Sequence, residues 1–312
     1  MKYLSLCIPT NGISEWVFPV LDNIYNQKIE QSLWEVVVTN NGNNEDFHKQ
    51  MISYALLHNN LIYEKTDAYL FENQIYALRL ASGEYLKFMN HRSILEPDAI
   101  KWMIEQIKDV IEEKPIMYFS NGVLKLKKTK KCNSFDEFIY GLREFASWTT
   151  GVGVWKSDFE RIPRDWKYNK ISPHSDVLFW ERHRNCYLID DTVWCHDIDT
   201  SNAKKGKYDL YKTFGVEEPY ITIGLYIDGD ISARTCKYVI RCYEKRLSVF
   251  YAGFNILHQI CSYNINGFNE IMGILMNKRR VLIGAYLKIP KIVVLSLCHK
   301  VKNNFIKRCT LC

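Results

Sequence analysis

Short apolar runs alternate with stretches of helical periodicity over the first two hundred residues, and this alternation limits the fold more than any other feature. The apolar runs are Leu4 to Ile8, Trp34 to Thr39, Leu61 to Glu64 and Tyr85 to Met89. The helix-like stretches are Glu15 to Gln27, Glu45 to His58, Glu72 to Ala81 and Pro97 to about Glu113. Strands that alternate with helices predict a mostly parallel, doubly wound α/β sheet, whose ligands bind at the carboxyl ends of its strands.

The following segment is less regular. Ile116 to Lys128 contains two apolar runs around Asn121-Gly122, which is a typical two-residue hairpin turn, so a β-hairpin is expected there. A helix is expected from His174 to Arg184, and an edge strand from Tyr187 to Cys195.

Charge is distributed unevenly along the chain. Residues 233–312 contain 14 Lys and Arg but 2 Asp and Glu, a charge of +12, whereas residues 1–232 carry −6. The periodicity after about Ile231 is helical, so we expect an α/β domain over residues 1–212 and a basic helical extension over residues 213–312. The basic extension predicts an anionic partner, and a membrane surface is favoured because no nucleic-acid-binding motif is recognised. The alternative is a solvated helical cap on the domain.

The sequence also predicts a location. Its start shows no secretory signal, and no apolar stretch reaches the roughly 18 residues that a spanning helix needs. The longest candidate, Val281 to Cys298, is interrupted by Lys288, Pro290 and Lys291. The ten cysteines lack metal-binding spacing and are expected to be reduced thiols. We therefore expect a cytoplasmic protein, peripheral on the inner face of the plasma membrane.

Four segments carry motifs in a characteristic order. They are Leu4 to Asn11 (Leu-Ser-Leu-Cys-Ile-Pro-Thr-Asn), Val36 to Asn44, Asn73 to Tyr85 (ending Ala-Ser-Gly-Glu-Tyr) and Leu95 to Ala99 (Leu-Glu-Pro-Asp-Ala). With these motifs the chain resembles family-2 glycosyltransferases of GT-A fold, particularly the abequosyltransferase-like bacterial enzymes that build O-antigen and capsule. The resemblance covers about residues 2–200.

The resemblance implies an inverting transfer of a sugar from a nucleotide-sugar to a hydroxyl of a lipid-linked or oligosaccharide acceptor. Asn40 stands where the family usually has Asp. Because an amide both donates and accepts hydrogen bonds, the donor is expected to be a UDP- or a CDP/CMP-linked sugar. A plain Asn-Gly turn at Asn40 is the alternative. The residues expected to bind the donor are Pro9, Thr10, Asn11, Asn40, Asn73, Gln74, Asn90, His91 and Arg92.

The family's metal-binding Asp-x-Asp motif is missing after the fourth strand. The chain has Asn90 to Ser93 (Asn-His-Arg-Ser) there, and no carboxylate before Glu96. Because Mg²⁺ and Mn²⁺ prefer oxygen ligands and a guanidinium repels them, we expect no required metal or other cofactor. Arg92, helped by His91 or Lys87, is expected to neutralise the donor diphosphate. The alternative is that Arg92 is a solvated loop residue in a relative without activity.

The acceptor side is expected in the segment around Trp148, Thr150 and Gly151, which resembles the family's acceptor-facing segment. Asp176, near the start of a predicted helix, is the expected catalytic base, and His174 is the alternative base. Asp176 as a helix-stabilising acid is the structural alternative. The alternative function is a non-catalytic GT-A-like module that binds a glycan or a partner enzyme.

Overall fold

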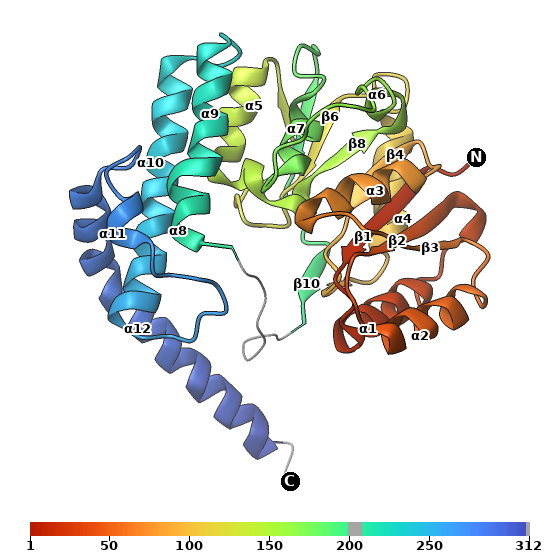
Figure 1. Cartoon of the computed structure of the whole chain (residues 1–312), viewed down its shortest axis with the longest axis horizontal. Helices are drawn as coiled ribbons and strands as arrows, with labels where there is room; N and C mark the ends of the chain where they lie inside the picture. The colour runs from red at the N-terminus through yellow and green to blue at the C-terminus, as the bar shows by residue number, and fades with distance from the viewer. Residues whose placement is uncertain (199–207, 310–312) are drawn as a thin grey trace. The chain divides into compact units, whose positions relative to one another are not determined.

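The computed structural model describes residues 1–198 and 208–309 (Figure 1). The chain divides into two compact units, Met1–Asp199 and Thr200–Cys312. The sequence placed the boundary after residue 212, whereas the short helix α8 (Leu210–Lys212) groups with the second unit.

The first unit is built on a central sheet with strand order β3-β2-β1-β4-β8. Its strands are β1 (Leu4–Thr10), β2 (Trp34–Asn40), β3 (Leu61–Lys65), β4 (Tyr85–Phe88) and β8 (Gly153–Trp155). The strands β1 to β4 are parallel, and β8 is antiparallel to β4. The four predicted strands are therefore confirmed, and the α/β class with them.

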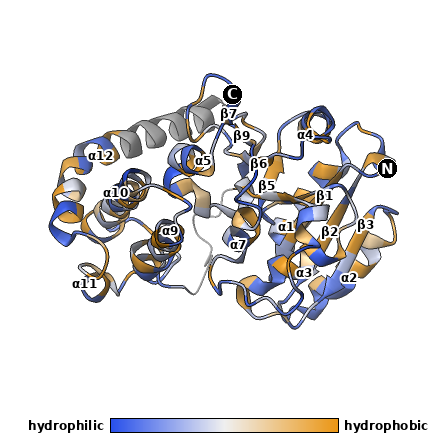
Figure 2. Ribbon diagram, turned by 90° about the horizontal axis from the view of Figure 1, so that it is seen from above, coloured by the Kyte–Doolittle hydropathy of each residue, from blue (hydrophilic) through white to orange (hydrophobic). Residues whose placement is uncertain are grey.

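Successive side chains of a strand point to opposite faces of the sheet, so both faces carry apolar side chains. Helices cover both faces. Leu4, Leu6 and Ile8 of β1 belong to a core cluster that they share with one layer of helices. Cys7 points the other way, and its Sγ lies 3.8 Å from the carbonyl oxygen of Ala77. The first layer comprises α1 (Ser14–Tyr25), α2 (Glu45–Ala55) and α4 (Ala99–Asp109), and the other face carries α3 (Asn73–Leu80). Figure 2 shows apolar colouring along the strands between these helices.

The turn after β2 brings two loops into close contact. Asn44 caps α2 by accepting a hydrogen bond from the Phe47 N–H (3.1 Å), and it donates to the Gly12 carbonyl (3.2 Å). A Cβ on Gly42 would lie 1.9 Å from the Asn11 carbonyl oxygen, so only glycine fits there. The loops that follow β1 and β2 are thus fixed against each other.

Two smaller sheets complete the first unit. One has the order β6-β9-β7, with β6 (Ile116–Phe119), β9 (Tyr187–Asp190) and β7 (Lys130–Cys132). The other pairs β5 (Ser93–Leu95) with β10 (Cys195–Asp197) in antiparallel register. The remaining helical segments are α5 (Phe135–Leu142), α6 (Lys156–Phe159), α7 (Pro173–Phe179) and the 3₁₀ turns Gln31–Leu33, Leu70–Glu72, Arg143–Ser147 and Thr149–Gly151.

The hairpin expected over Ile116 to Lys128 is wrong. Asn121 and Gly122 do form a turn with positive φ angles of 53° and 77°. However, the Asp191 carboxylate accepts hydrogen bonds from the backbone N–H groups of Leu124 and Leu126, and this holds the chain after the turn away from β6. The parallel neighbour of β6 is therefore β9, a distant strand.

The second unit is helical, as predicted. Its elements are α8, a π-helical turn (Thr213–Glu217), α9 (Glu218–Ile227), α10 (Ala233–Phe250), a second π-helical turn (Tyr251–Ile256), α11 (Phe268–Ile271) and α12 (Lys278–Cys309). Within residues 1–198 and 208–309, none of the helices combines the length and apolar character that spanning a bilayer requires.

Candidate functional site

Asn73, at the start of α3, joins the carboxyl ends of β1 and β2. Its Nδ2 donates to the carbonyls of Thr10 (3.1 Å) and Thr39 (2.8 Å), and its Oδ1 accepts from the Thr66 hydroxyl (2.9 Å). The side chain is buried, and both amide hydrogens are used within the protein. Asn73 therefore sets the spacing of the two strand ends at which a nucleotide is expected.

Asn40, at the end of β2, forms the turn that was the alternative expectation. Its Oδ1 accepts from the Gly42 N–H (2.8 Å), and its Nδ2 lies 3.4 Å from the Tyr63 hydroxyl. Asn40 is buried, whereas Asn11 at the end of β1 is exposed. Contact between Asn40 and a base stays a prediction, and Asn11 is the more accessible amide at this edge.

Thr10, the last residue of β1, contacts His91 in the loop that follows β4. The Thr10 hydroxyl lies 2.7 Å from His91 Nδ1 and accepts from the Gly12 N–H (3.1 Å). Burial, with the Arg92 charge beside it, lowers the pKa of His91 to about 4. The imidazole is therefore neutral at pH 7, so the expected help from His91 in neutralising phosphate charge is not available. A neutral imidazole still offers a hydrogen bond.

Arg92 is held by a carboxylate that sequence reasoning did not assign. Its Nε lies 3.3 Å from Asp197 Oδ2, and the Ser93 hydroxyl donates to Asp197 Oδ1 (2.7 Å). This contact follows from the β5–β10 register, which places Asp197 opposite Ser93. The Arg92 side chain is only 18% exposed, so it does not extend into bulk solvent. In the described residues Asp197 engages only Nε, and the two terminal amino groups of the guanidinium keep their donors.

A second imidazole–carboxylate pair lies on and beside the β5–β10 sheet. His196 Nδ1 lies 2.9 Å from Glu96 Oε1, and the His196 side chain is exposed. Among residues 1–198 and 208–309, no three or more His, Cys, Asp and Glu side chains gather as a group able to hold a metal ion.

Lys87 of β4 is fully buried and contacts the predicted acceptor segment. Its Nζ donates to the carbonyls of Phe88 (3.1 Å), Val152 (3.2 Å) and Thr150. The ring centroids of Trp194 and Phe119 lie 4.8 and 5.4 Å from Nζ. All three ammonium hydrogens have acceptors inside the protein, so the expected contribution of Lys87 to diphosphate binding is wrong.

The predicted acceptor segment is a tightly packed 3₁₀ turn, Thr149–Gly151. Thr150 is buried, and a Cβ on Gly151 would lie 2.2 Å from Cζ of the Tyr118 ring. The Tyr118 hydroxyl donates to the Trp148 carbonyl (3.2 Å), which keeps the ring against the glycine. Thr150 and Gly151 therefore shape the backbone of this turn, and Trp148, which is half-buried, keeps an accessible side chain.

His174, the alternative base, contacts both a predicted donor residue and the predicted acceptor segment. Its Nε2 lies 2.9 Å from the Ser147 carbonyl, and its Nδ1 lies 3.1 Å from Gln74 Oε1 and 3.2 Å from the Thr149 hydroxyl. Burial lowers the pKa of His174 to about 4. The predicted donor residue Gln74 and the predicted catalytic residue His174 are thus brought into contact.

Asp176, the expected base, lies one turn into α7 and is half-buried. Its Oδ2 accepts from the backbone N–H of Asn169 at 2.5 Å, in the preceding loop. Burial raises the pKa of the carboxyl group, and the Asn169 hydrogen bond opposes that rise. The described part of the chain gives Asp176 no other hydrogen bond, so Oδ1 keeps its capacity to accept a proton. A raised pKa is what a carboxylate base needs near neutral pH.

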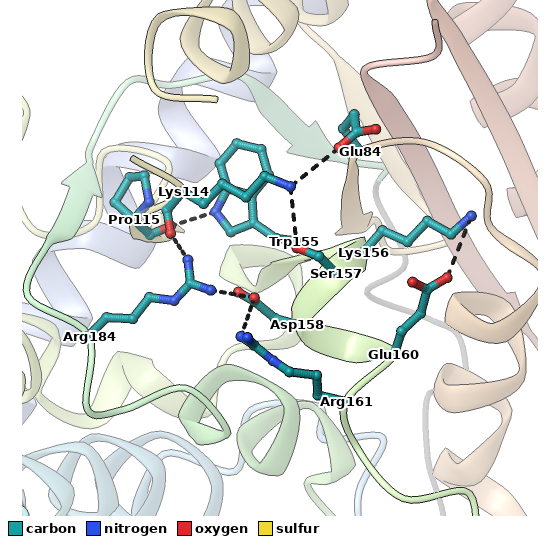
Figure 3. A network of polar contacts seen from close by, with 10 residues as sticks. All are labelled: Glu84, Lys114, Pro115, Trp155, Lys156, Ser157, Asp158, Glu160, Arg161 and Arg184. Atoms are coloured by element: carbon teal, nitrogen blue, oxygen red, sulfur yellow. Dashed lines mark hydrogen bonds and ion pairs between the residues drawn. The ribbon is translucent and has the colours of Figure 1, made fainter. Parts of the chain in front are cut away.

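A buried acid supports the strand that follows the acceptor turn. Asp158 of α6 accepts from Arg161 Nη2 (2.7 Å) and from Arg184, and Arg184 also donates to the Lys114 carbonyl. Trp155 Nε1 at the end of β8 donates to the Pro115 carbonyl (2.7 Å). Figure 3 shows Asp158 between the two guanidinium groups. No sequence motif pointed to this network.

The mostly parallel central sheet with helices on both faces has the GT-A fold of the solved structures named below, which confirms the predicted fold class, and the C-terminal region is helical as predicted.

Comparison with solved structures shows which proteins have a similar fold. The chain is similar to S. aureus TarS 1-349 in complex with UDP-GlcNAc, with a TM-score of 0.55, 12% identity, and coverage of 91% of this chain and 79% of that one. The similarity to TarS 1-349 in complex with UDP has a TM-score of 0.52, 12% identity, and coverage of 88% and 76%. A further TarS structure matches with a TM-score of 0.54 and 14% identity. The match covers 82% of this chain and 45% of that longer TarS chain. No protein-family model and no curated protein sequence matches the chain.

Proposed function

We propose that the chain is an inverting, nucleotide-sugar-dependent glycosyltransferase. The observation that carries the proposal is the GT-A fold, shared with TarS structures that contain UDP-GlcNAc and UDP. The edge of the sheet where β1 and β2 end supports it, because Asn73 clamps these strand ends at the place where α/β folds bind ligands.

In the proposed reaction Asp176 takes the proton of the acceptor hydroxyl as the oxygen attacks the anomeric carbon. The new C–O bond forms on the face opposite the nucleotide, the bond between the anomeric carbon and the phosphate oxygen breaks, and the nucleotide departs with the electron pair. One displacement of this kind inverts the configuration. The half-buried Asp176 carboxyl, with its raised pKa and one uncommitted oxygen, supports the role of base.

Arg92 is proposed to stabilise the charge that develops on the leaving group. The contact between its Nε and Asp197 fixes the plane of the guanidinium and leaves the donors of both terminal amino groups for phosphate oxygens. Arg92 stands where the family that the chain resembles has metal-binding carboxylates. We therefore propose that turnover needs no divalent cation. A UDP- or CDP/CMP-linked sugar is the proposed donor.

The wider setting is proposed from the sequence. The resemblance to O-antigen and capsule enzymes favours a lipid-linked or oligosaccharide acceptor in bacterial surface polysaccharide synthesis. The charge of +12 on residues 233–312 favours attachment to the anionic inner face of the plasma membrane. Cosedimentation with anionic vesicles that is lost at high salt is the expected result.

The catalytic assignment is tested with a panel of nucleotide-sugars in the presence of EDTA, following nucleotide release. Asp176→Asn is expected to lower turnover by about 100-fold or more, because general base catalysis contributes that much. Asp165→Asn, an exposed carboxylate in the preceding loop, is the matched control and should keep full turnover. Arg92→Gln should lower turnover with the melting temperature unchanged.

A second assay identifies the donor nucleotide, and the two assays together separate an enzyme from a non-catalytic module. A thermal-shift assay with UDP, CDP, CMP, GDP and dTDP identifies the nucleobase of the donor, since a nucleotide that binds the folded chain raises the melting temperature of the chain. Nucleotide binding without turnover of any donor would favour the non-catalytic module. Activity that requires Mn²⁺ would contradict the assigned role of Arg92.

A further inference from the structure

The second unit contains a groove that the proposed reaction does not use. It has a volume of about 570 Å³ and lies between α9, α10 and the segment that leads into α12. Its lining is mainly apolar, with Ile223 from α9, Ala233 and Ile240 from α10, and Leu275 before α12. A groove of this size and character matches those that hold small ligands in proteins.

Two cationic side chains line this groove. Lys237 and Arg241 lie one helical turn apart on α10, both line the groove, and both are exposed. Neither has an ion-pair partner within the described ranges 1–198 and 208–309. Apolar walls around a charge strengthen its field, so the pair favours an anion at this point.

The third cation of the groove is already neutralised. Arg280 Nη1 lies 2.6 Å from Glu244 Oε2, and the other oxygen of Glu244 accepts from the Asn277 N–H (2.9 Å). This contact ties the start of α12 to α10 and leaves the groove with a net charge of +2 from Lys237 and Arg241. The anion-binding end is therefore on α10.

Tyr226, which lines the groove, is itself 46% exposed, and two further exposed apolar residues adjoin lining residues in the sequence. Tyr226 lines the groove and is followed by Ile227, which is 74% exposed. Leu275 lines it as well and is preceded by Ile274, which is 59% exposed. Exposed apolar side chains next to an apolar groove mark a surface that meets an apolar partner.

We propose that the groove binds one anionic lipid, with its acyl chain along Ile223, Ile240 and Leu275 and its phosphate between Lys237 and Arg241. A free anion would leave the apolar floor in water, and a neutral lipid would leave both cations without a counter-charge. The proposal concerns a single saturable site, and it stands independently of sugar transfer.

The test uses the full chain and dodecyl phosphate below its micelle-forming concentration, with binding measured by titration calorimetry. One molecule is expected to bind per chain, whereas dodecyl maltoside and inorganic phosphate should each bind at least tenfold more weakly. The double variant Lys237→Glu/Arg241→Glu is expected to weaken dodecyl phosphate binding by more than tenfold. Ala233→Phe, which fills the groove without changing its charge, should weaken it as well.

Matched controls make the result decisive. Arg279→Glu removes an exposed cation next to Arg280 that does not line the groove, and it should leave the affinity unchanged. Unchanged melting temperatures and unchanged nucleotide release from the donor separate loss of this site from loss of folding or of the proposed activity. Equal binding of dodecyl phosphate by the wild type and the double variant, equal binding of dodecyl maltoside, or equal binding of inorganic phosphate would each overturn the proposal.

Discussion

Lys87, on the strand β4, and Asp158, on the short helix α6, are two buried charged groups, and the protein compensates their charges in different ways. Asp158, just after β8, is paired with the guanidinium groups of Arg161 and Arg184. Lys87, on β4, has no carboxylate partner in the part of the chain that the structure describes. Its ammonium is instead enclosed by three carbonyl oxygens and two aromatic rings.

The difference shows what each charge contributes. Two of the three Lys87 acceptors, Thr150 and Val152, belong to the acceptor turn and its end, so the ammonium joins β4 to that turn. Carbonyl dipoles compensate a buried charge less completely than opposite charges do, and burial lowers the pKa of Lys87 to about 7. Asp158, in contrast, stabilises the packing of the segments around α6. One charge positions a predicted site, and the other maintains the scaffold.

The largest expected effect is from Asp158→Asn. Removing the carboxylate leaves Arg184, whose side chain is only 20% exposed, without its counter-charge. Breaking a buried pair in this way costs about 3 kcal/mol. Chemical denaturation at pH 7 measures the loss. Glu160→Gln is the control, because its pair with Lys156 is at the surface and 3.8 Å long, and a loss as large as that of Asp158→Asn would remove the distinction.

The second prediction concerns the pH dependence that Lys87 produces. Its pKa is about 7 in the folded chain against an ordinary value of 10.5, so between these values the unfolded chain binds more protons. The free energy of unfolding should therefore rise with pH in this window. The stability gained in this way is lost again as the pH falls to the folded-state pKa of Lys87, about 7. Between pH 7.5 and 9.5 the rise amounts to about 2 kcal/mol.

Lys87→Met removes this titration, so its unfolding free energy should lack the rise that the wild type shows. Lys101→Met, on the exposed side of α4, is the control and should follow the wild type. Parallel curves for the wild type and Lys87→Met would mean that the three carbonyls compensate the ammonium completely.

The sheet could be predicted from the sequence because each of its first four strands is a short apolar run that is recognisable without long-range information. The apolar runs of β1 to β4 and the helices between them needed no long-range information, and the motifs at the strand ends placed Thr10, Asn73 and His91 at one edge. Partners remote in the sequence were not predictable. Asp197 reaches Arg92 only through the β5–β10 register, and the hairpin was wrong because Asp191, far along the chain, holds the segment after its turn.

Whether an individual polar side chain binds a ligand or the surrounding backbone could not be predicted from the sequence either. Asn40 and Lys87 are residue types that often bind ligands, and no sequence pattern indicated that the surrounding backbone uses their polar atoms. A buried polar group must find a partner, and in both cases that partner is a nearby N–H or carbonyl group. Local polarity therefore pointed to the strand ends at which a site is expected, but it did not show which of these polar atoms are already bonded within the protein.

The smallest expected effect comes from the outer partner of Asp158. The Arg161 side chain is 55% exposed and also contacts Glu181 at 2.9 Å, so its charge is largely solvated. Arg161→Gln should lower the unfolding free energy by less than about 1 kcal/mol, as exposed ion pairs do. Arg184→Gln should cost clearly more, because Arg184 also bonds the Lys114 carbonyl. Denaturation of the two variants side by side measures the difference, and equal losses would mean that Asp158 depends on both guanidinium groups alike.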